Sequence, residues 1–187
     1  MKKNLFIAAF ALLALMSCEN NKKLEVMDFE LQYPASYDVR VLSSPEEAEG
    51  GYVSLSGSKD GNTISKFFVK VYVIDDDENI DNQEYMTGVA DLFIAEEYGS
   101  DMEILSKMVE NGTDMELLEE PDEVLADAKS RYVEYTYKVD GEFDIHNRIE
   151  VMYDEDKEHC IIARYQCADK SDIAGLQKMV RGIKFKD

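Results

Sequence analysis

Apolar and polar residues alternate most clearly between residues 130 and 168, which predicts β-strands there. In two neighbouring runs the apolar positions are Val133, Tyr135, Tyr137 and Val139, followed by Phe143, Ile145, Ile149, Val151 and Tyr153. Asp140 and Gly141 lie between the runs, and this dipeptide is typical of a hairpin turn. We therefore expect a hairpin with one apolar face toward a core and one polar face.

The length of the hairpin loop sets the register. A two-residue loop would put the two apolar sets on opposite faces, because side chains alternate along a strand. The three-residue loop 140–142 aligns them and pairs Val139 with Phe143. The same register gives two opposite-charge pairs on the polar face: Lys138 with Asp144 and Glu134 with Arg148.

Shorter runs predict further strands on either side of the hairpin. They cover residues 26–33, 38–42, 51–58, 64–75, 115–119, 159–167 and 181–185. The run from Ile64 to Ile74 is apolar at both odd and even positions, which is typical of a strand covered on both faces.

Helical spacing replaces alternation in two places. Residues 83–98 and 101–110 predict two helices separated at Gly99, and Asn111-Gly112 is a plausible C-terminal stop. The expected apolar stripe of this region includes Val89, Leu92, Phe93, Ile104, Leu105 and Met108. Residues 169–180 predict a later helix, with Asp169 or Ser171 as its cap. The apolar stripe of the later helix is Ile173, Leu176, Met179 and Val180.

The first eighteen residues differ from the rest of the chain. Lys2 and Lys3 precede an uncharged apolar run over residues 5–16. Twelve residues of helix span about 18 Å, which is too short for a hydrocarbon core of roughly 30 Å. The pattern therefore predicts a secretory signal peptide and not a membrane span.

The end of this segment, Leu15-Met16-Ser17-Cys18, resembles the bacterial lipobox. The resemblance implies that the Cys18 thiol carries diacylglycerol and that cleavage falls between Ser17 and Cys18. The alternative is an ordinary signal peptide that Cys18 happens to follow. We expect a signal peptide over 1–17, a lipidated cysteine with a short tether over 18–23, and one globular domain over 24–187. The location would be the bacterial cell envelope, facing the periplasm or the cell surface.

Composition narrows the classes of partner. The chain has 187 residues, with 40 acidic and 20 basic residues and a formal charge of −20. This charge argues against nucleic acid, which requires a positive surface, and favours a protein or cationic ligand or simply good solubility. Cys160 and Cys167 lie seven residues apart on one expected strand, so their Cα atoms would be roughly 23 Å apart. We expect no disulfide between them.

The order of elements resembles the PsbP/Mog1-type α/β/α sandwich. The resemblance is carried by Tyr33-Pro34 after the first strand, a long apolar strand ending at Asp75, the antiparallel strands around 132–165, and a last helix leading to Ile183-Lys184-Phe185. It implies an α+β fold, mostly antiparallel sheet packed by helices, of the kind found in uncharacterised bacterial lipoproteins. A cystatin-like or NTF2-like curved sheet is the alternative fold.

An acidic run follows the long strand. Asp75, Asp77, Asn79 and Asp81 alternate as calcium ligands do in a cation-binding loop. The EF-hand pattern fails because Ile80 stands where Gly is required and Met86 where a bidentate Glu is required. A solvated acidic loop without a cation is the alternative, and no other cofactor is expected.

The remaining candidates lie on the strands of residues 130–168. His146, His159 and Cys160 could form a zinc site or a nucleophile–base pair only if the fold brought them together. The polar face of the hairpin is a candidate partner surface and comprises Tyr132, Glu134, Thr136, His146, Arg148 and Glu150. The sequence shows no catalytic motif. We therefore expect a membrane-anchored envelope lipoprotein with a non-catalytic binding or accessory domain. The alternative is a hydrolase or metal-dependent enzyme that uses His146, His159 or residues 75–81.

Overall fold

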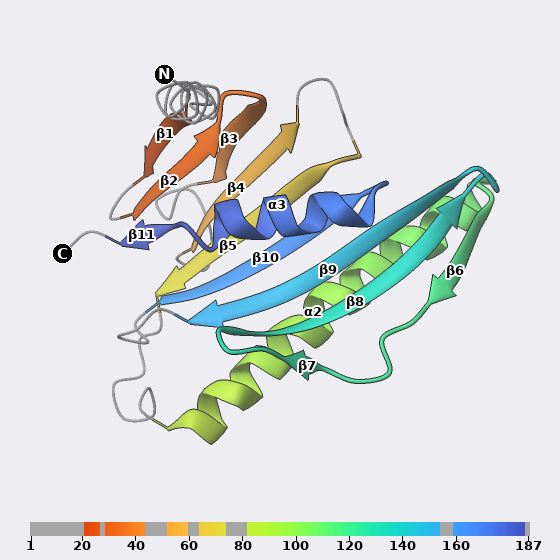
Figure 1. Ribbon diagram of the computed structural model, residues 1–187. Coiled ribbons are helices and arrows are strands. Elements are labelled where there is room, and N and C mark those ends of the chain that lie inside the picture. Colours follow the sequence, from red (N-terminus) through yellow and green to blue (C-terminus); the bar gives the residue numbers. More distant parts are fainter. Residues whose placement is uncertain are drawn as a thin grey trace, which may run out of the picture.

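The structure is a computed structural model that describes residues 21–26, 29–43, 52–59, 64–73, 82–153 and 159–185. The expected signal peptide, the lipobox and the acidic run 75–81 lie outside these residues. In the described part, two antiparallel sheets pack with two helices (Figure 1). The helices are α2 (Gln83–Glu110) and α3 (Lys170–Val180). Among the helices of the described residues, none is both long and apolar enough to cross a membrane.

The larger sheet forms the centre of the molecule. Its strand order is β3 (Tyr37–Ser43), β4 (Tyr52–Lys59), β5 (Lys66–Val73), β10 (His159–Cys167), β9 (Phe143–Tyr153), β8 (Ser130–Val139) and β6 (Met115–Glu119), and β7 (Leu125–Ala126) pairs with β8. The smaller sheet has the order β1 (Asn21–Val26), β2 (Phe29–Pro34) and β11 (Lys184–Phe185).

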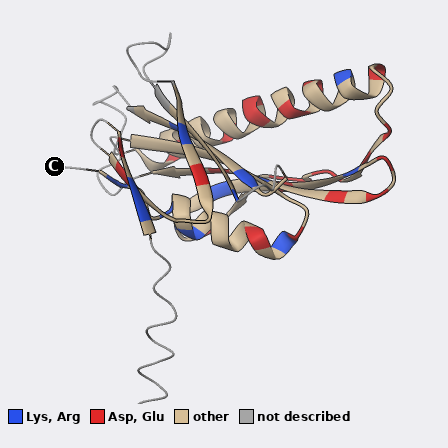
Figure 2. Cartoon of the chain, turned by 90° about the horizontal axis from the view of Figure 1, so that it is seen from above, with Lys and Arg blue, Asp and Glu red and all other residues tan. Residues whose placement is uncertain are grey.

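Layers cover both faces of the larger sheet, as Figure 2 shows from above. Helix α2 packs against β8, β9 and β6 on one face, while α3 contacts β10, β5 and β2 on the other face. Each side has its own buried apolar cluster, one built around Ile94, Tyr135 and Ile149 and the other around Phe67, Tyr165 and Leu176. The α+β, mostly antiparallel prediction is confirmed, with the layers of the sandwich and not of the curved-sheet alternative.

The β8–β9 hairpin has the predicted register. Val139 pairs with Phe143, and the opposite-charge pairs Lys138–Asp144 and Glu134–Arg148 lie side by side. The loop 140–142 turns through positive φ angles at Asp140 (51°) and Gly141 (67°). Odd-numbered apolar side chains of both strands lie under α2, so the other face of the hairpin carries the polar residues.

The structure corrects the predicted helices of residues 83–110 and confirms the predicted helix of residues 169–180. Helix α2 is continuous from Gln83 to Glu110, so the predicted break at Gly99 is wrong. A glycine inside a helix costs only about 1 kcal/mol relative to alanine, which packing against the sheet readily offsets. The buried residues of α2 are Met86, Ala90, Ile94, Glu97 and Asp101, whereas Leu92 of the predicted stripe is 66% exposed. In α3 all four predicted apolar residues are buried, and Asp169 is the cap.

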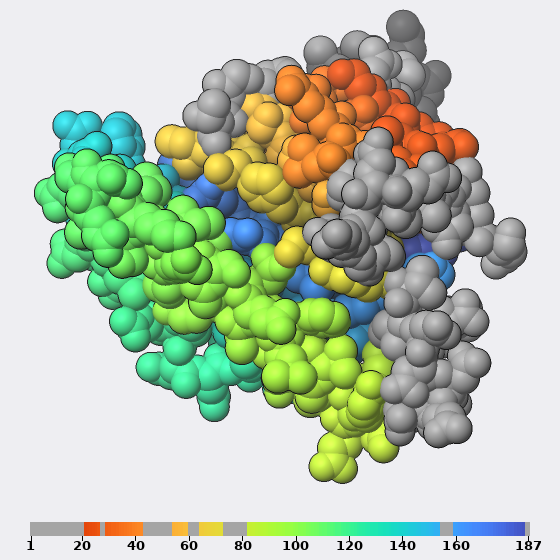
Figure 3. Space-filling view, turned by 180° about the vertical axis from the view of Figure 1, so that it is seen from behind, coloured from red at the N-terminus to blue at the C-terminus, as the bar shows by residue number. Residues whose placement is uncertain are grey.

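Two strand predictions also need correction. The predicted strand over 64–75 is not covered on both faces throughout, because Phe68 in β5 is 36% exposed while Phe67 and Val69 are fully buried. Helix α2 contacts the second half of β5, where Phe93 stacks on Tyr72 and Glu97 pairs with Lys70. Part of β5 stays at the surface between α2 and β4, as Figure 3 shows from behind. At the N-terminus, β1 begins at Asn21, inside the expected tether. Its lysines occupy solvent-facing positions of an edge strand, where polarity does not mark a linker.

Candidate functional site

The site begins with a turn that leads into β8. The Asp127 carboxylate accepts hydrogen bonds from the backbone N–H groups of Lys129 (2.8 Å) and Ser130 (2.9 Å) and from the Ser130 hydroxyl (3.0 Å). An Asp that closes on the backbone two and three residues later is a common turn chemistry. The turn fixes Asp127 and Ser130 at the start of the polar face of the hairpin.

Arg181 approaches the same turn from the C-terminal end of α3. Its Nη2 donates to Asp127 Oδ2 (2.6 Å) and to Ser130 Oγ (3.0 Å), and its Nε donates to Glu150 Oε1 (3.1 Å). A cation is favoured at a helix C-terminus, where the last carbonyl groups leave partial negative charge. Arg181 therefore ties the end of α3 to β8 and β9 through ion pairs as well as apolar packing.

Glu150 is the buried centre of this network, with a relative exposure of 0%. Its carboxylate accepts hydrogen bonds from Ser130, Arg181 and Gln177, and Arg148 lies 3.4 Å away. Burial would raise the pKa of Glu150, but the hydrogen bonds from Ser130 and Arg181 and the charge of Arg148 outweigh burial and hold the pKa below its ordinary value. The group is thus a buried carboxylate that stays ionised at neutral pH.

The pKa values of Asp127 and Arg181 move in opposite directions, and both shifts favour the charged form. Burial opposes the ionised form of Asp127, yet hydrogen bonds from the Lys129 backbone, Arg181 and Ser130 hold its pKa well below the ordinary value. Burial likewise opposes the charge of Arg181, but Glu150 and Asp127 raise its pKa. The network is therefore a set of mutually stabilised charges, and none of these groups titrates near neutral pH.

Arg148 links the network to the middle of the hairpin. Its side chain is 8% exposed, its guanidinium lies 3.4 Å from the centre of the Tyr132 ring, and it pairs with Glu134 (3.1 Å) and Asp127 (3.4 Å). Farther along the same face, the Thr136 hydroxyl lies 3.2 Å from Nδ1 of His146. The fold thus brings together all six residues of the predicted polar surface, although Thr136, Arg148 and Glu150 are buried and not exposed.

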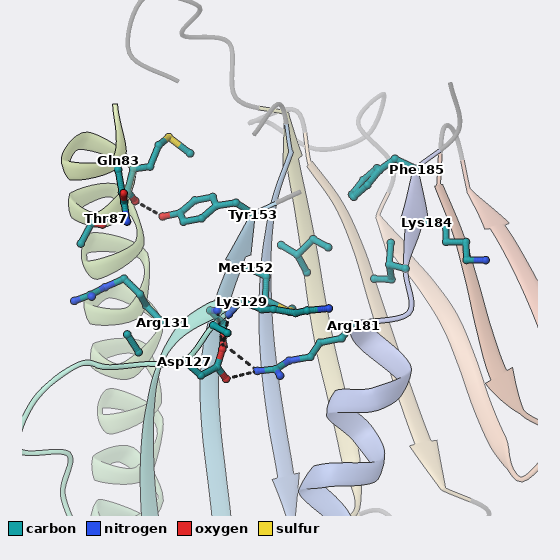
Figure 4. A pocket seen from close by; sticks show the side chains of 16 residues that line it. Gln83, Thr87, Asp127, Lys129, Arg131, Met152, Tyr153, Arg181, Lys184 and Phe185 are labelled. Atoms are coloured by element: carbon teal, nitrogen blue, oxygen red, sulfur yellow. Dashed lines mark hydrogen bonds and ion pairs between the residues drawn. The ribbon is translucent and has the colours of Figure 1, made fainter. Parts of the chain in front are cut away.

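A cleft of about 970 Å³ opens beside this network, at the ends of β8 and β9 (Figure 4). Gln83 and Thr87 of α2 stand on one side, Lys184 and Phe185 of β11 on the other, and Met152 and Tyr153 of β9 lie between them. The polar network supplies Asp127, Ser130 and Arg181, and the apolar part comprises Met86, Ala126, Met152, Ile161, Ile183 and Phe185. Concave, partly apolar sites with a few fixed polar groups are the usual form of a ligand site.

The residues of the zinc and nucleophile hypotheses do not meet. By the strand register, His146 lies opposite Cys167 and His159 begins β10 eight residues away, roughly 26 Å along the strand. His159 stacks on Phe185 with ring centres 4.0 Å apart. Cys160 and Cys167 are buried, form no disulfide within the described residues, and lie on opposite faces of β10. In the described residues no group of three His, Cys, Asp or Glu could hold a metal ion.

The acidic calcium candidates Asp75, Asp77, Asn79 and Asp81 lie outside the described residues. Met86, at the position where an EF-hand needs its bidentate Glu, is a buried residue of α2. Sequence reasoning missed Asp127, Ser130, Lys129 and Arg181. The signals available were the Asp-x-x-Ser spacing of the turn and a basic residue at the end of the last helix.

Comparisons with known proteins find similarity in solved structures only. No family model matches this chain, and no curated protein matches it. The chain is similar to cyanobacterial PsbP from Synechocystis sp. PCC 6803, with 12% identity, 90% of this chain and 94% of that chain covered, and a TM-score of 0.49. It is also similar to the Ran-binding protein Mog1p of Saccharomyces cerevisiae, with 13% identity, 90% and 97% covered, and a TM-score of 0.38. A third similar structure is a Pseudomonas aeruginosa protein of unknown function, with 10% identity, 86% of this chain and 91% of that chain covered, and a TM-score of 0.26. Both names of the predicted resemblance are thus among the similar structures, and no functional residue is carried over from them.

Proposed function

We propose that this chain is a lipid-anchored protein of the bacterial cell envelope whose domain binds a ligand in the cleft and performs no catalysis. The observation that carries the binding role is the cleft itself, which brings apolar side chains together with charged groups already held in place by the network. A rigid site binds with a smaller loss of conformational freedom than one that must be ordered by its ligand.

The anchor rests on the sequence Leu15-Met16-Ser17-Cys18 after a basic start and a short apolar run. Each buried methylene contributes about 0.8 kcal/mol, so two or three acyl chains would hold the domain at a bilayer almost permanently. Strand β1 begins at Asn21, three residues after Cys18, and three residues reach at most about 10 Å. A lipidated Cys18 would therefore keep the domain close to the membrane.

The arrangement of polar side chains supports a binding role over a hydrolytic one. Glu150 and Arg148 are buried and paired with each other and with neighbours, so they offer no free base to a substrate. His146 and His159 lie at opposite ends of the sheet, and His146 contacts Thr136. The Thr136 hydroxyl beside His146 belongs to a buried residue, which does not favour attack on a substrate.

Lipidation is tested by metabolic labelling with a palmitate analogue. The native chain should be labelled and should sediment with membranes, and Cys18→Ser should be unlabelled and soluble. A control, Cys167→Ser, should be labelled like the native chain. Equal labelling of native chain and Cys18→Ser, or none in either, would contradict the anchor.

Binding through the cleft is tested by photo-crosslinking in whole cells. A photoreactive amino acid at Thr87, on the wall of the cleft, should give a discrete adduct. The same amino acid at Glu142, at the exposed tip of the hairpin, is the control and should not. Identical patterns at both positions would remove the cleft as the binding site while leaving the lipid anchor intact.

A further inference from the structure

We propose that the ligand of the cleft is an organic anion, a carboxylate or phosphate group carried on an apolar body. This inference rests on the proposed binding function, because it names the chemical class of the ligand for the same cleft. Three features of the cleft lead to it: the sign of its charged residues, the spare donors on its cations, and its apolar lining.

The charge of the lining is opposite to that of the chain. Acidic residues outnumber basic ones by 40 to 20 in the whole sequence. Among the described residues that line the cleft, Lys129, Arg131, Arg181 and Lys184 are basic and Asp127 is acidic. A concave surface of one sign concentrates ions of the other sign even on a molecule of unfavourable net charge, because salt screens distant charges within about 8–10 Å. The cleft therefore favours an anion, although the composition by itself favours cationic partners.

The cations retain hydrogen-bond donors for a ligand. Arg181 uses Nε and Nη2 in its bonds to Glu150, Asp127 and Ser130, and in the described part of the chain its Nη1 has no acceptor. Arg131 is held by Asp91 through Nε (2.6 Å) and Nη2 (3.1 Å), which likewise leaves Nη1 unused. The ammonium group of Lys129 has no acidic partner among the described residues.

Acidic residues hold both guanidinium groups in place, which favours the binding of an anion to their remaining donors. Asp91 holds the guanidinium of Arg131 by one edge, while Glu150 and Asp127 hold that of Arg181, so neither side chain needs to be ordered when a ligand binds. Hydrogen bonds between a guanidinium or ammonium group and an anion are about twice as strong as neutral ones. In Figure 4 the Lys184 side chain extends outward on the far side of the cleft, so Lys129 and Arg181 are the principal anion-binding residues.

The apolar lining argues against a small inorganic anion. Met86, Met152, Ile161, Ile183 and Phe185 border the cleft, and a volume of about 970 Å³ is at the upper end of the usual range for organic ligands. Phe185 is held by stacking on His159 and by an edge contact with Phe29, whose ring centre is 6.4 Å away. Met86, Met152 and Ile161 are 3–6% exposed, whereas Ile183 and Phe185 are partly exposed. A bare phosphate would contact only the polar groups, whereas an apolar body would also cover Ile183 and Phe185.

Methionine methyl NMR tests the proposal directly, because Met86 and Met152 line the cleft. The sample is the mature chain with Cys18→Ser, labelled with [methyl-13C]methionine, and the signals are assigned through Met86→Leu and Met152→Leu. The probes are dodecanoate and dodecyl phosphate, with neutral dodecyl maltoside and inorganic phosphate as controls, all below their micelle concentrations. Met108, exposed near the far end of α2, is the internal control.

We expect one or both chain-bearing anions to shift Met86 and Met152 but not Met108. Comparing dodecanoate with dodecyl phosphate then identifies which head group the cleft takes. Lys129→Ala should weaken binding of the anion roughly ten- to a hundredfold, the range of one charge-assisted hydrogen bond. Lys178→Ala removes the same charge from an exposed position on α3 and should change binding less than twofold.

Three outcomes would overturn the inference. Equal binding of dodecyl maltoside, insensitive to Lys129→Ala, would show an apolar site without anion preference. Binding of inorganic phosphate as tight as that of dodecyl phosphate would remove the apolar body. Unchanged Met86 and Met152 signals with every probe would exclude this ligand class, while a cleft-specific adduct from the Thr87 crosslinker would still support the proposed function.

Discussion

Replacing Arg181 by Met should destabilise the fold by about 2–3 kcal/mol. Removing one member of a buried ion pair typically costs about 3–5 kcal/mol, because the other charge stays buried without its partner. Here the stranded carboxylate would be Glu150, which is fully buried, but it keeps donors from Ser130, Gln177 and Arg148. The side chain of Arg181 is also 27% exposed, so water offsets part of the loss. Both effects lower the expected cost.

The physical cause is tested by a double-mutant cycle with Glu150→Gln. This change removes the buried charge and keeps the size of the side chain, so Arg181→Met should cost about 1–2 kcal/mol less in its presence. The measurement is urea unfolding of the mature chain with Cys18→Ser at pH 7, followed by circular dichroism. The result that would refute the reasoning is additivity: the loss of unfolding free energy in the double variant would equal the sum of the two single losses within about 0.3–0.5 kcal/mol. Additivity would show no energetic coupling between the two residues.

Acid should act on the same network: the pKa values of Asp127 and Glu150 are held below their ordinary values of 3.8 and 4.5, so both groups stabilise the fold above about pH 4.5. This stabilisation should be lost progressively below that pH, and an equilibrium unfolding series should show a shallower loss in Glu150→Gln. The thiol of Cys167 is fully buried and burial raises its pKa to about 11, so a thiol reagent should modify it only on unfolding, and rapid labelling of the native chain would contradict its placement. Excess calcium should leave the thermal midpoint unchanged, since the acidic run lacks the required Gly and Glu, and a rise that Asp77→Asn abolishes would instead assign a cation to residues 75–81.

The hairpin register could be predicted because two independent constraints agree on it. Parity of the apolar residues requires an odd loop, and the same loop places Glu134 beside Arg148 and Lys138 beside Asp144. The break at Gly99 could not be judged in the same way, because the small helical cost of a glycine competes with packing energy that a local pattern does not contain. The exposure of Phe68 in β5 has a similar cause: coverage of a strand depends on where a helix crosses it, and α2 contacts β5 at Lys70 and Tyr72.

The same distinction applies to the candidate site, because strand parity predicts one part of it and tertiary packing determines the rest. The six residues of the polar face share a face by strand parity alone, so the sequence predicts their proximity. Arg181 joins Asp127 across 54 residues and Glu150 across 31, and only the packing of α3 on β10 brings them together. The cleft requires still more, because residues of α2, β7, β8, β9, β10 and β11 and Arg181 just after α3 border it at once.

The structure also changes what the polar face does. Charges on an exposed face would be available to a partner, but Glu150 and Arg148 are buried and paired with each other, and Glu150 also pairs with Arg181. Their part is to attach the end of α3 to the sheet, and the surface available for binding moves to the adjoining cleft. Arg181 belongs to both, since it holds α3 and borders the cleft. Because a ligand that binds only the folded state adds RT ln(1 + [L]/Kd) to its stability, an anion bound at Nη1 of Arg181 would raise the stability of the fold that Arg181 helps to hold together. Under the proposed binding role, Arg181 would therefore contribute both to ligand affinity and to the attachment of α3.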